Sequence, residues 1–97
     1  MKKVQRIREI IKENMDILRA RYKVKTLGIF GSYARGNQRH RSDIDILAEF
    51  DETIDLFTFV ELEEFLSKVL GVKVDLIMKD TLKPRIRERI LKEAIPV

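Results

Sequence analysis

Two aspartates, Asp43 and Asp45, stand two residues apart in a segment that alternates between polar and apolar residues. On a β-strand this spacing places both side chains on one face, with their Cα atoms about 6 to 7 Å apart. Such a pair suits two divalent cations held roughly 3.5 to 4 Å apart, as two-metal phosphoryl-transfer sites require. Carboxylate oxygens favour Mg²⁺ or Mn²⁺ over zinc. The spacing therefore suits metal-assisted phosphoryl transfer, although such a pair alone is more often solvated surface or a turn cap.

A third carboxylate, Asp75, lies inside the apolar run Val-Asp-Leu-Ile. An ionised carboxylate in an apolar strand is costly unless a cation or hydrogen bonds compensate it. If this strand pairs beside the strand of Asp43 and Asp45, all three carboxylates share one face. On its own, Asp75 could instead be a charge that protects an edge strand from aggregation.

The loop upstream of the aspartates reads Gly-Ser-Tyr-Ala-Arg-Gly over residues 31–36. Gly31 would let a phosphate approach the backbone amides without a Cβ in the way. Ser32 adds a hydroxyl donor, and Arg35 adds a charge-assisted donor for a polyphosphate. A Gly-Ser pair alone is also an ordinary turn, so the loop gains meaning only beside the carboxylates.

Hydrophobic periodicity predicts the elements that position these residues. They are a helix over Val4–Tyr22, a strand over Val24–Gly31, a loop or short helical turn over Gly31–Arg41, a strand over Asp43–Phe50, turn and cap residues over Asp51–Asp55, a helix over Leu56–Leu70 closed by Gly71, a strand over Val72–Met78, a last helix, and an edge strand over Ala94–Val97. The last helix should have Thr81 as its N-cap, Pro84 in its first turn, and a core stripe of Ile86, Ile90 and Leu91. This order predicts an α/β (α+β) fold in which helices pack on a small mixed sheet. No composition break divides the 97 residues, so we expect a single domain over 1–97.

The composition excludes several kinds of site. The chain has no cysteine, which rules out a disulfide framework, a thiolate zinc site and a cysteine nucleophile. The lone histidine, His40, argues against a histidine-rich metal site or a Ser-His-Asp triad, and we expect it to be a solvated loop residue. No apolar stretch approaches the roughly 18 to 20 residues that cross a bilayer, so the sequence predicts a cytoplasmic protein without a membrane partner.

The net charge of +4 hides an uneven distribution of +9 over residues 1–41, −8 over 42–82 and +3 over 83–97. The basic ends and the acidic middle are expected to face different partners. Because the basic segments lack aromatic residues at a stacking spacing, nucleic-acid binding has little support. Arg85, Arg87 and Arg89 point around the last helix and are expected to be solvated.

Together the motifs resemble the Gly-Ser, Asp-x-Asp and Asp signature of the DNA polymerase beta-like nucleotidyltransferase superfamily. Its parts here are Gly31-Ser32, Ser42-Asp43-Ile44-Asp45-Ile46-Leu47 and Asp75. The chain's length and its Gly-Ser-Tyr-Ala-Arg-Gly loop resemble, more narrowly, the minimal nucleotidyltransferases, the MntA-like antitoxins encoded beside HEPN-domain toxins. The resemblance spans nearly the whole chain and implies a polymerase beta palm-like sheet.

The resemblance implies a role for each matching residue. Gly31 and Ser32 would grip the triphosphate of ATP, with Arg35 as a supporting contact, and Asp43 and Asp45 would bind Mg²⁺. Asp75 would complete the metal site and help to activate the attacking hydroxyl. AMP would then pass from ATP to a tyrosine of a partner HEPN toxin, in a type VII toxin–antitoxin system.

Other interpretations stay open at this point. The protein could be an antitoxin without catalysis that keeps its site for nucleotide or metal and neutralises the partner by complex formation. Transfer to a small molecule or to RNA is a third alternative, with less support because no second lobe is present. Tyr33 is expected to pack in the interior. The role of Gly28, the acceptor, the nucleotide preference and any homo-oligomer are not decided by the sequence.

Overall fold

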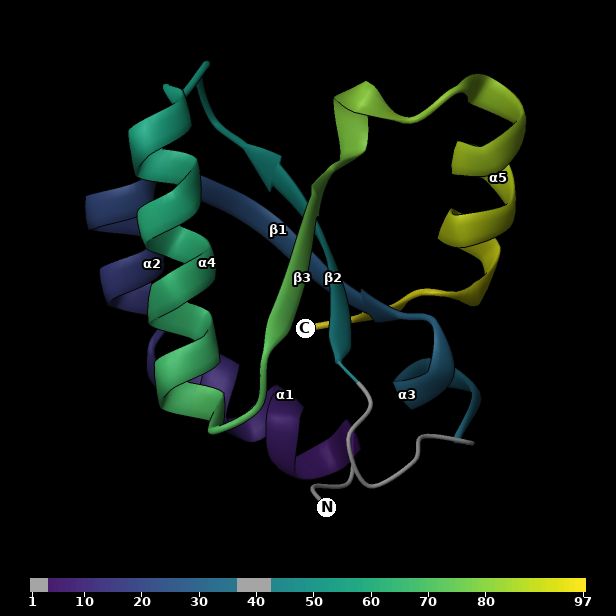
Figure 1. The fold of residues 1–97 in the computed structure, drawn as a ribbon, viewed down its shortest axis with the longest axis horizontal. Helices are drawn as coiled ribbons and strands as arrows, with labels where there is room; N and C mark the ends of the chain where they lie inside the picture. Colours follow the sequence, from purple (N-terminus) through teal and green to yellow (C-terminus); the bar gives the residue numbers. More distant parts are fainter. Residues whose placement is uncertain (1–3, 37–42) are drawn as a thin grey trace.

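The computed structural model describes residues 4–36 and 43–97, so the expectations for His40 and Ser42 lie outside the described residues. Its elements follow in chain order as α1 (Val4–Glu13), α2 (Met15–Tyr22), β1 (Val24–Phe30), α3 (Ser32–Arg35), β2 (Ile44–Phe50), α4 (Leu56–Leu70), β3 (Val74–Met78), the 3₁₀ turn η1 (Lys79–Thr81), α5 (Pro84–Glu93) and β4 (Ile95–Pro96) (Figure 1). None of the helices in this part of the chain is both long and apolar enough to cross a bilayer.

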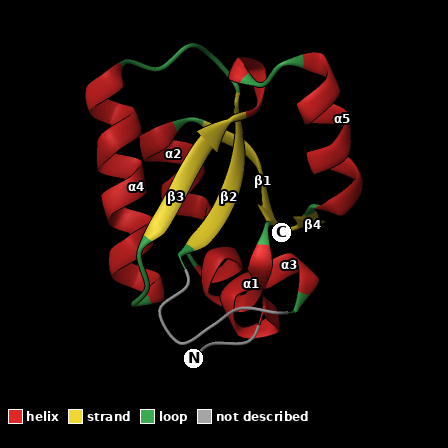
Figure 2. Ribbon diagram, turned by 45° about the vertical axis from the view of Figure 1, so that its right-hand side comes forward, coloured by secondary structure: helices red, strands yellow, loops and turns green. Residues whose placement is uncertain are grey.

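The strands form one mixed sheet in the order β3-β2-β1-β4. β1 is antiparallel to both β2 and β4, whereas β2 and β3 are parallel and joined by α4 as the crossover helix. Helices α1, α2 and α4 lie on one side of the sheet and α5 lies on the other (Figures 1 and 2). The predicted fold class, a small mixed sheet flanked by helices, is confirmed.

The main core lies between the sheet and helices α1, α2 and α4. The alternation in β2 sends its even-numbered residues into this core, where Ile44, Ile46 and Ala48 are almost fully buried. Leu62, Leu66 and Leu70 face them from α4, a helix that begins at the cap Asp55 and ends at Gly71 as predicted. Burial of these side chains fixes the register of β2 and therefore the face on which Asp45 lies.

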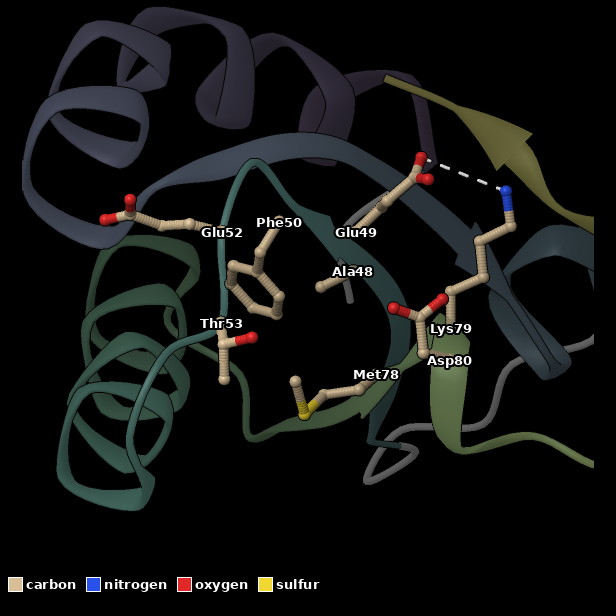
Figure 3. A pocket seen from close by; sticks show the side chains of 8 residues that line it. All are labelled: Ala48, Glu49, Phe50, Glu52, Thr53, Met78, Lys79 and Asp80. Carbon is tan, nitrogen blue, oxygen red and sulfur yellow. Dashed lines mark ion pairs between the residues drawn. The ribbon is translucent and has the colours of Figure 1, made fainter.

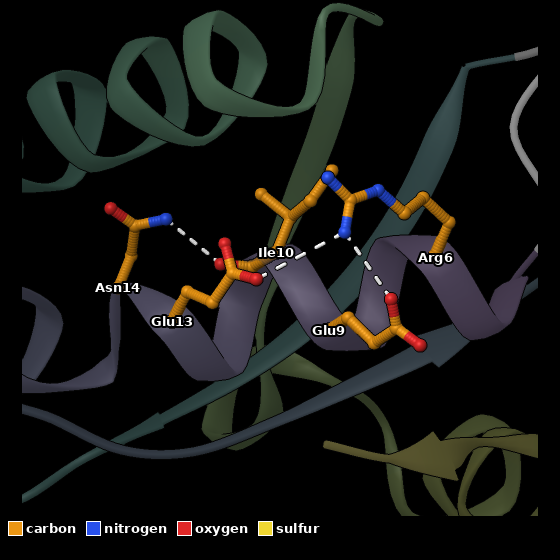
Figure 4. A network of polar contacts seen from close by, with 5 residues as sticks. All are labelled: Arg6, Glu9, Ile10, Glu13 and Asn14. Atoms are coloured by element: carbon orange, nitrogen blue, oxygen red, sulfur yellow. Dashed lines mark hydrogen bonds and ion pairs between the residues drawn. The ribbon is translucent and has the colours of Figure 1, made fainter.

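The first predicted helix is wrong in one respect, because it is broken at Asn14 into α1 and α2. The Asn14 side-chain Nδ2 donates to the carbonyl of Ile10 at 2.8 Å, while its backbone N–H bonds to Ile11 instead. The side chain thus takes the acceptor that the helical N–H would use. Figure 4 shows this contact at the end of α1, beside the ion pairs of Arg6 with Glu9 and Glu13. The predicted apolar stripe nevertheless remains buried or half-buried along both helices.

The C-terminal third departs further from prediction. β3 begins at Val74 rather than Val72. Thr81 is not a helix N-cap, because its hydroxyl donates to the carbonyl of Met78 at 2.8 Å within η1. The position of Pro84 in the first turn of α5 is confirmed, with Lys83 as the N-cap.

The predicted core stripe of α5 is wrong. Ile86 and Leu91 are 45% and 44% exposed, Ile90 is half-buried, and α5 buries no residue fully. The reason is that α5 stands off the second face of the sheet and leaves a cavity between them. Arg87 also differs from prediction, because it is half-buried and donates through Nη2 to the carbonyl of Leu82.

Candidate active site

Asp45 and Asp75 are direct partners in the parallel pairing of β2 with β3. Paired residues on neighbouring strands point to the same face, so both carboxylates stand on the side of the sheet away from the main core. Asp43 lies one residue before β2, on the same alternation as Asp45. The strand pairing and the alternation along β2 therefore place the three aspartates on one face of the sheet, as predicted. Asp75 is exposed rather than buried, because β3 is an edge strand of the sheet.

Gly31 directly follows the last residue of β1, Phe30, which is the strand partner of Asp45, so it lies next to this pair of carboxylates. Its backbone has φ of 75° and ψ of −149°, a conformation that essentially only glycine adopts. A Cβ at Gly31 would overlap Oδ2 of Asp45. Glycine is thus required here twice, for its backbone angles and for the space that the carboxylate occupies.

The signature loop continues as the single-turn helix α3, which Ser32 begins and Arg35 ends. Gly36 terminates the turn with a left-handed backbone, φ 74°. Tyr33 is 2% exposed, so its predicted packing role is confirmed. Burial, and to a smaller extent the nearby carboxylate of Asp43, raise the pKa of the Tyr33 phenol.

The electrostatics of the site centre on Asp45. Burial raises the pKa of its carboxyl most, and the negative charges of Asp75 and Asp43 raise it further. The guanidinium of Arg35 acts in the opposite direction, and Glu93 adds a smaller upward contribution. The carboxylate of Asp45, with two acidic neighbours, is a place where a bound cation would be stabilised.

Arg35 has a partner that the sequence did not reveal. Its Nη1 lies 2.5 Å from Oε1 of Glu93, at the end of α5. The two residues are 58 positions apart, and only the return of the chain through α5 and β4 brings them together. No local pattern in the sequence could have identified this ion pair. The Arg35 side chain is 53% exposed, so its guanidinium is accessible from the solvent.

The three carboxylates are donors that suit a divalent cation, although within the described part of the chain they do not form a preformed cage. Among residues 4–36 and 43–97, no three His, Cys, Asp or Glu side chains converge closely enough to enclose a metal ion. Asp43, Asp45 and Asp75 supply the hard oxygen ligands that Mg²⁺ prefers. Oδ2 of Asp45 takes the place that a Cβ at Gly31 would fill, so this carboxylate lies directly against the loop.

A separate pocket lies at the opposite end of the sheet, where β2 and β3 end (Figure 3). It measures about 260 Å³ and is lined by Ala48, Glu49, Phe50, Glu52, Thr53, Met78, Lys79 and Asp80. Because Asp45 and Asp75 lie near the beginnings of these parallel strands, this pocket does not belong to the carboxylate site.

Comparison with known proteins shows the family of the chain. The family model described as "Nucleotidyltransferase domain" matches residues 5–97. A candidate protein adenylyltransferase of Methanocaldococcus jannaschii is 49% identical over 98 residues and is covered at 100% of both chains. Protein adenylyltransferase MntA of Thermococcus cleftensis is 43% identical over 94 residues, which are 97% of this chain and 95% of that protein.

Two solved structures share the fold. One is described as a candidate minimal nucleotidyltransferase and superposes with a TM-score of 0.84 at 35% identity, covering 99% of this chain and 97% of the other. The second is a toxin–antitoxin with AMP-PNP, with a TM-score of 0.70 at 25% identity over 95% of this chain and 69% of that one. The protein described here therefore belongs to the nucleotidyltransferase domain family, in its minimal, MntA-like branch.

Proposed function

We propose that this protein is a Mg²⁺-dependent protein adenylyltransferase that moves AMP from ATP to a tyrosine hydroxyl of a HEPN-domain toxin and so acts as its antitoxin. We treat residues 1–97 as one domain that carries the whole site. The full-length similarity to MntA supports the adenylyltransferase activity. The similarity to a toxin–antitoxin with AMP-PNP supports a toxin partner and an adenine nucleotide.

The observation that carries the proposal is the pairing of Asp45 with Asp75 beside Gly31. The three positions come from β1, β2 and β3, and the pairing of β2 with both of its neighbours fixes where they lie relative to one another. This places two acidic side chains, which are ligands for a divalent cation, next to the glycine loop whose donors would bind the phosphates.

Asp43, Asp45 and Asp75 would hold Mg²⁺ in the proposed site. When bound, Mg²⁺ neutralises the charge that develops on the phosphate oxygens of an in-line displacement. Gly31 and Ser32 would bind the triphosphate, and Arg35 would donate to it from the end of α3. These assignments rest on the match of the residues to the family signature and on the common face of β1, β2 and β3.

In the proposed reaction, the phenolic oxygen of the acceptor forms a bond to the α-phosphorus of ATP. The bond between that phosphorus and the oxygen that bridges to the β-phosphorus breaks, and pyrophosphate leaves with the electron pair. Asp75 accepts the phenolic proton, because it is more exposed than its strand partner Asp45 and can reach an acceptor on the surface. The products are an O-adenylylated tyrosine and pyrophosphate.

The test uses the purified protein, Mg²⁺ and the HEPN-domain product of an adjacent gene. Label from [α-³²P]ATP should appear on that protein, label from [γ-³²P]ATP should not, and mass spectrometry should find AMP on a tyrosine. If no label transfers and the double variant Asp43→Ala/Asp45→Ala still neutralises the toxin, the protein acts by complex formation and the enzymatic proposal is wrong.

A further inference from the structure

A cavity of about 320 Å³ lies between α5 and the sheet face that carries the aspartates. Its walls are mostly apolar, with Gly28 and Leu47 on the sheet and Leu91 and Ala94 on the other side. The size falls at the lower end of the range for small-molecule pockets. Nothing in the proposed chemistry of the phosphates uses this cavity.

The strand register places the cavity directly beside the catalytic pair. Phe30 is paired with Asp45, and the next pair on the same face is Gly28 with Leu47. Two residues along a strand advance about 6.6 to 6.8 Å. The cavity floor is therefore one step along the sheet from the carboxylates, at the distance where a ribose would separate a nucleobase from the α-phosphate.

Gly28 contributes to the cavity by having no side chain. It is buried within β1, and its backbone does not have the positive φ that would require glycine. A Cβ there would make only ordinary contacts, 3.5 Å to the Cβ of Ala94 and 3.7 Å to the carbonyl oxygen of Ile95. A methyl group at Gly28 would therefore fit against Ala94 and Ile95, whereas a larger side chain such as valine would extend into the cavity.

The end of the cavity away from the aspartates is polar, and contacts among Thr26, Glu49 and Lys79 fix its side chains. Oε1 of Glu49 accepts from the hydroxyl of Thr26 at 3.1 Å and lies 3.8 Å from Nζ of Lys79. Figure 3 shows the Glu49 and Lys79 side chains pointing to the side where β4 lies. The Glu49 carboxylate, beside Lys79 and next to the apolar wall, offers an acceptor to a ligand's amino group.

We infer that this cavity is the nucleobase subsite for ATP, with the adenine ring against Leu47 and Leu91, beside Gly28, and its 6-amino group donating to Glu49. The inference rests on the proposed function, since the phosphates must lie at Gly31 for the ring to reach this place. A tyrosine acceptor fits less well, because its ring begins next to the attacking oxygen and carries no amino group for Glu49.

The first experiment measures binding by calorimetry in the presence of Mg²⁺ for the wild-type protein and the variants Gly28→Ala and Gly28→Val. AMP-PNP probes the whole site, and inorganic tripolyphosphate probes the phosphate region alone. We expect Gly28→Val to weaken AMP-PNP binding by about tenfold or more, and Gly28→Ala by less, with tripolyphosphate binding unchanged. Thermal melting of both variants confirms that they fold, and Gly28→Ala covers the case in which valine is too large.

The second experiment compares AMP-PNP with GMP-PNP. Guanine presents a carbonyl oxygen where adenine has its amino group, so the wild-type protein should prefer AMP-PNP. Glu49→Gln, whose amide can donate to that oxygen, should lower this preference by about tenfold.

The outcomes separate the inference from the function beneath it. Folded Gly28→Val protein that binds AMP-PNP like the wild type would overturn the subsite. If such a variant binds AMP-PNP normally but no longer labels its partner, the cavity takes the acceptor ring instead. Wild-type protein that binds tripolyphosphate and AMP-PNP equally well would refute the subsite while leaving the phosphate site intact, whereas failure to bind either ligand would refute the proposed function itself.

Discussion

Replacement of Gly31 by alanine should damage both the fold and the chemistry, for two separable reasons. The positive φ of 75° with ψ of −149° is strained for any residue with a Cβ. The added Cβ would also overlap Oδ2 of Asp45, so the carboxylate must move away from its present position. The first effect acts on stability and the second on the reaction.

The expected magnitudes follow from these two causes. A non-glycine residue in such a backbone region costs about 1 to 3 kcal/mol. For a domain of this size, this corresponds to a fall in melting temperature of roughly 5 to 20 °C. A displacement of about 1 Å in a positioned catalytic group can cost about 100-fold in rate, and we expect a loss of that order for transfer of AMP.

The matched control is Gly36→Ala. Gly36 has nearly the same φ, 74°, but a Cβ there would meet no atom within 4 Å in the described structure. This variant should lose about 1 to 2 kcal/mol of stability and keep its transfer rate. Circular dichroism melts and the labelled-ATP assay, run below both melting temperatures, compare the two. Equal transfer rates for the two variants would refute the claim that a Cβ at Gly31 displaces the Asp45 carboxylate and so slows the reaction.

Three further predictions concern charged groups. Asp45→Asn should melt at a higher temperature than the wild type at pH 7 without Mg²⁺, because burial and the neighbouring aspartates raise the pKa of Asp45. Wild-type stability falls as the pH rises from 3.8 through the raised pKa, so the difference in melting temperature should vanish below pH 3.8. Asp55→Ala should melt at a lower temperature than the wild type at pH 7, because the Thr58 backbone N–H lowers the pKa of this cap carboxyl. That stabilisation is complete above pH 3.8 and is lost as the pH falls through the lowered pKa, so the melting temperatures of the variant and the wild type should converge in acid. Glu93→Gln should lower the free energy of unfolding in urea by less than about 1 kcal/mol, since its Arg35 partner is exposed, and a larger loss would show that the ion pair holds α5 in place.

The parts of the fold that were predictable from sequence are those with a local cause. The alternation over Ile44–Phe50 was predictable because one face of β2 packs in the main core and the other carries Asp45 and Glu49. The helix Leu56–Leu70 was bounded by Asp55, which accepts from the Thr58 N–H, and by Gly71 with its left-handed backbone. Periodicity and caps act within a few residues, so a single sequence reveals them.

The errors have causes that act over longer distances or compete with periodicity. Asn14 breaks the first helix through a side-chain hydrogen bond that the apolar stripe does not report. The apolar residues of α5 are spaced like a core stripe, but the helix stands off a sheet whose main core is already filled from the other side.

The candidate site was predictable in its members and not in its surroundings. Asp43, Asp45 and Asp75 could be placed on one face once β3 was assumed to pair with β2. Their roles, and those of Gly31, Ser32 and Arg35, remain predictions. The ion pair with Glu93 and the cavity at Gly28 depend on how the C-terminal segment returns to β1, which no spacing in the sequence encodes.

The central claim is that the parallel pairing of β2 with β3 creates the catalytic carboxylate pair. The most direct test is the rate of AMP transfer to the HEPN-domain partner by Asp75→Asn, with Asp80→Asn as the control at an exposed acid outside the site. We predict that Asp75→Asn folds like the wild type and transfers AMP at least about 100-fold more slowly, while Asp80→Asn transfers normally. A folded Asp75→Asn protein with the wild-type transfer rate would contradict the account.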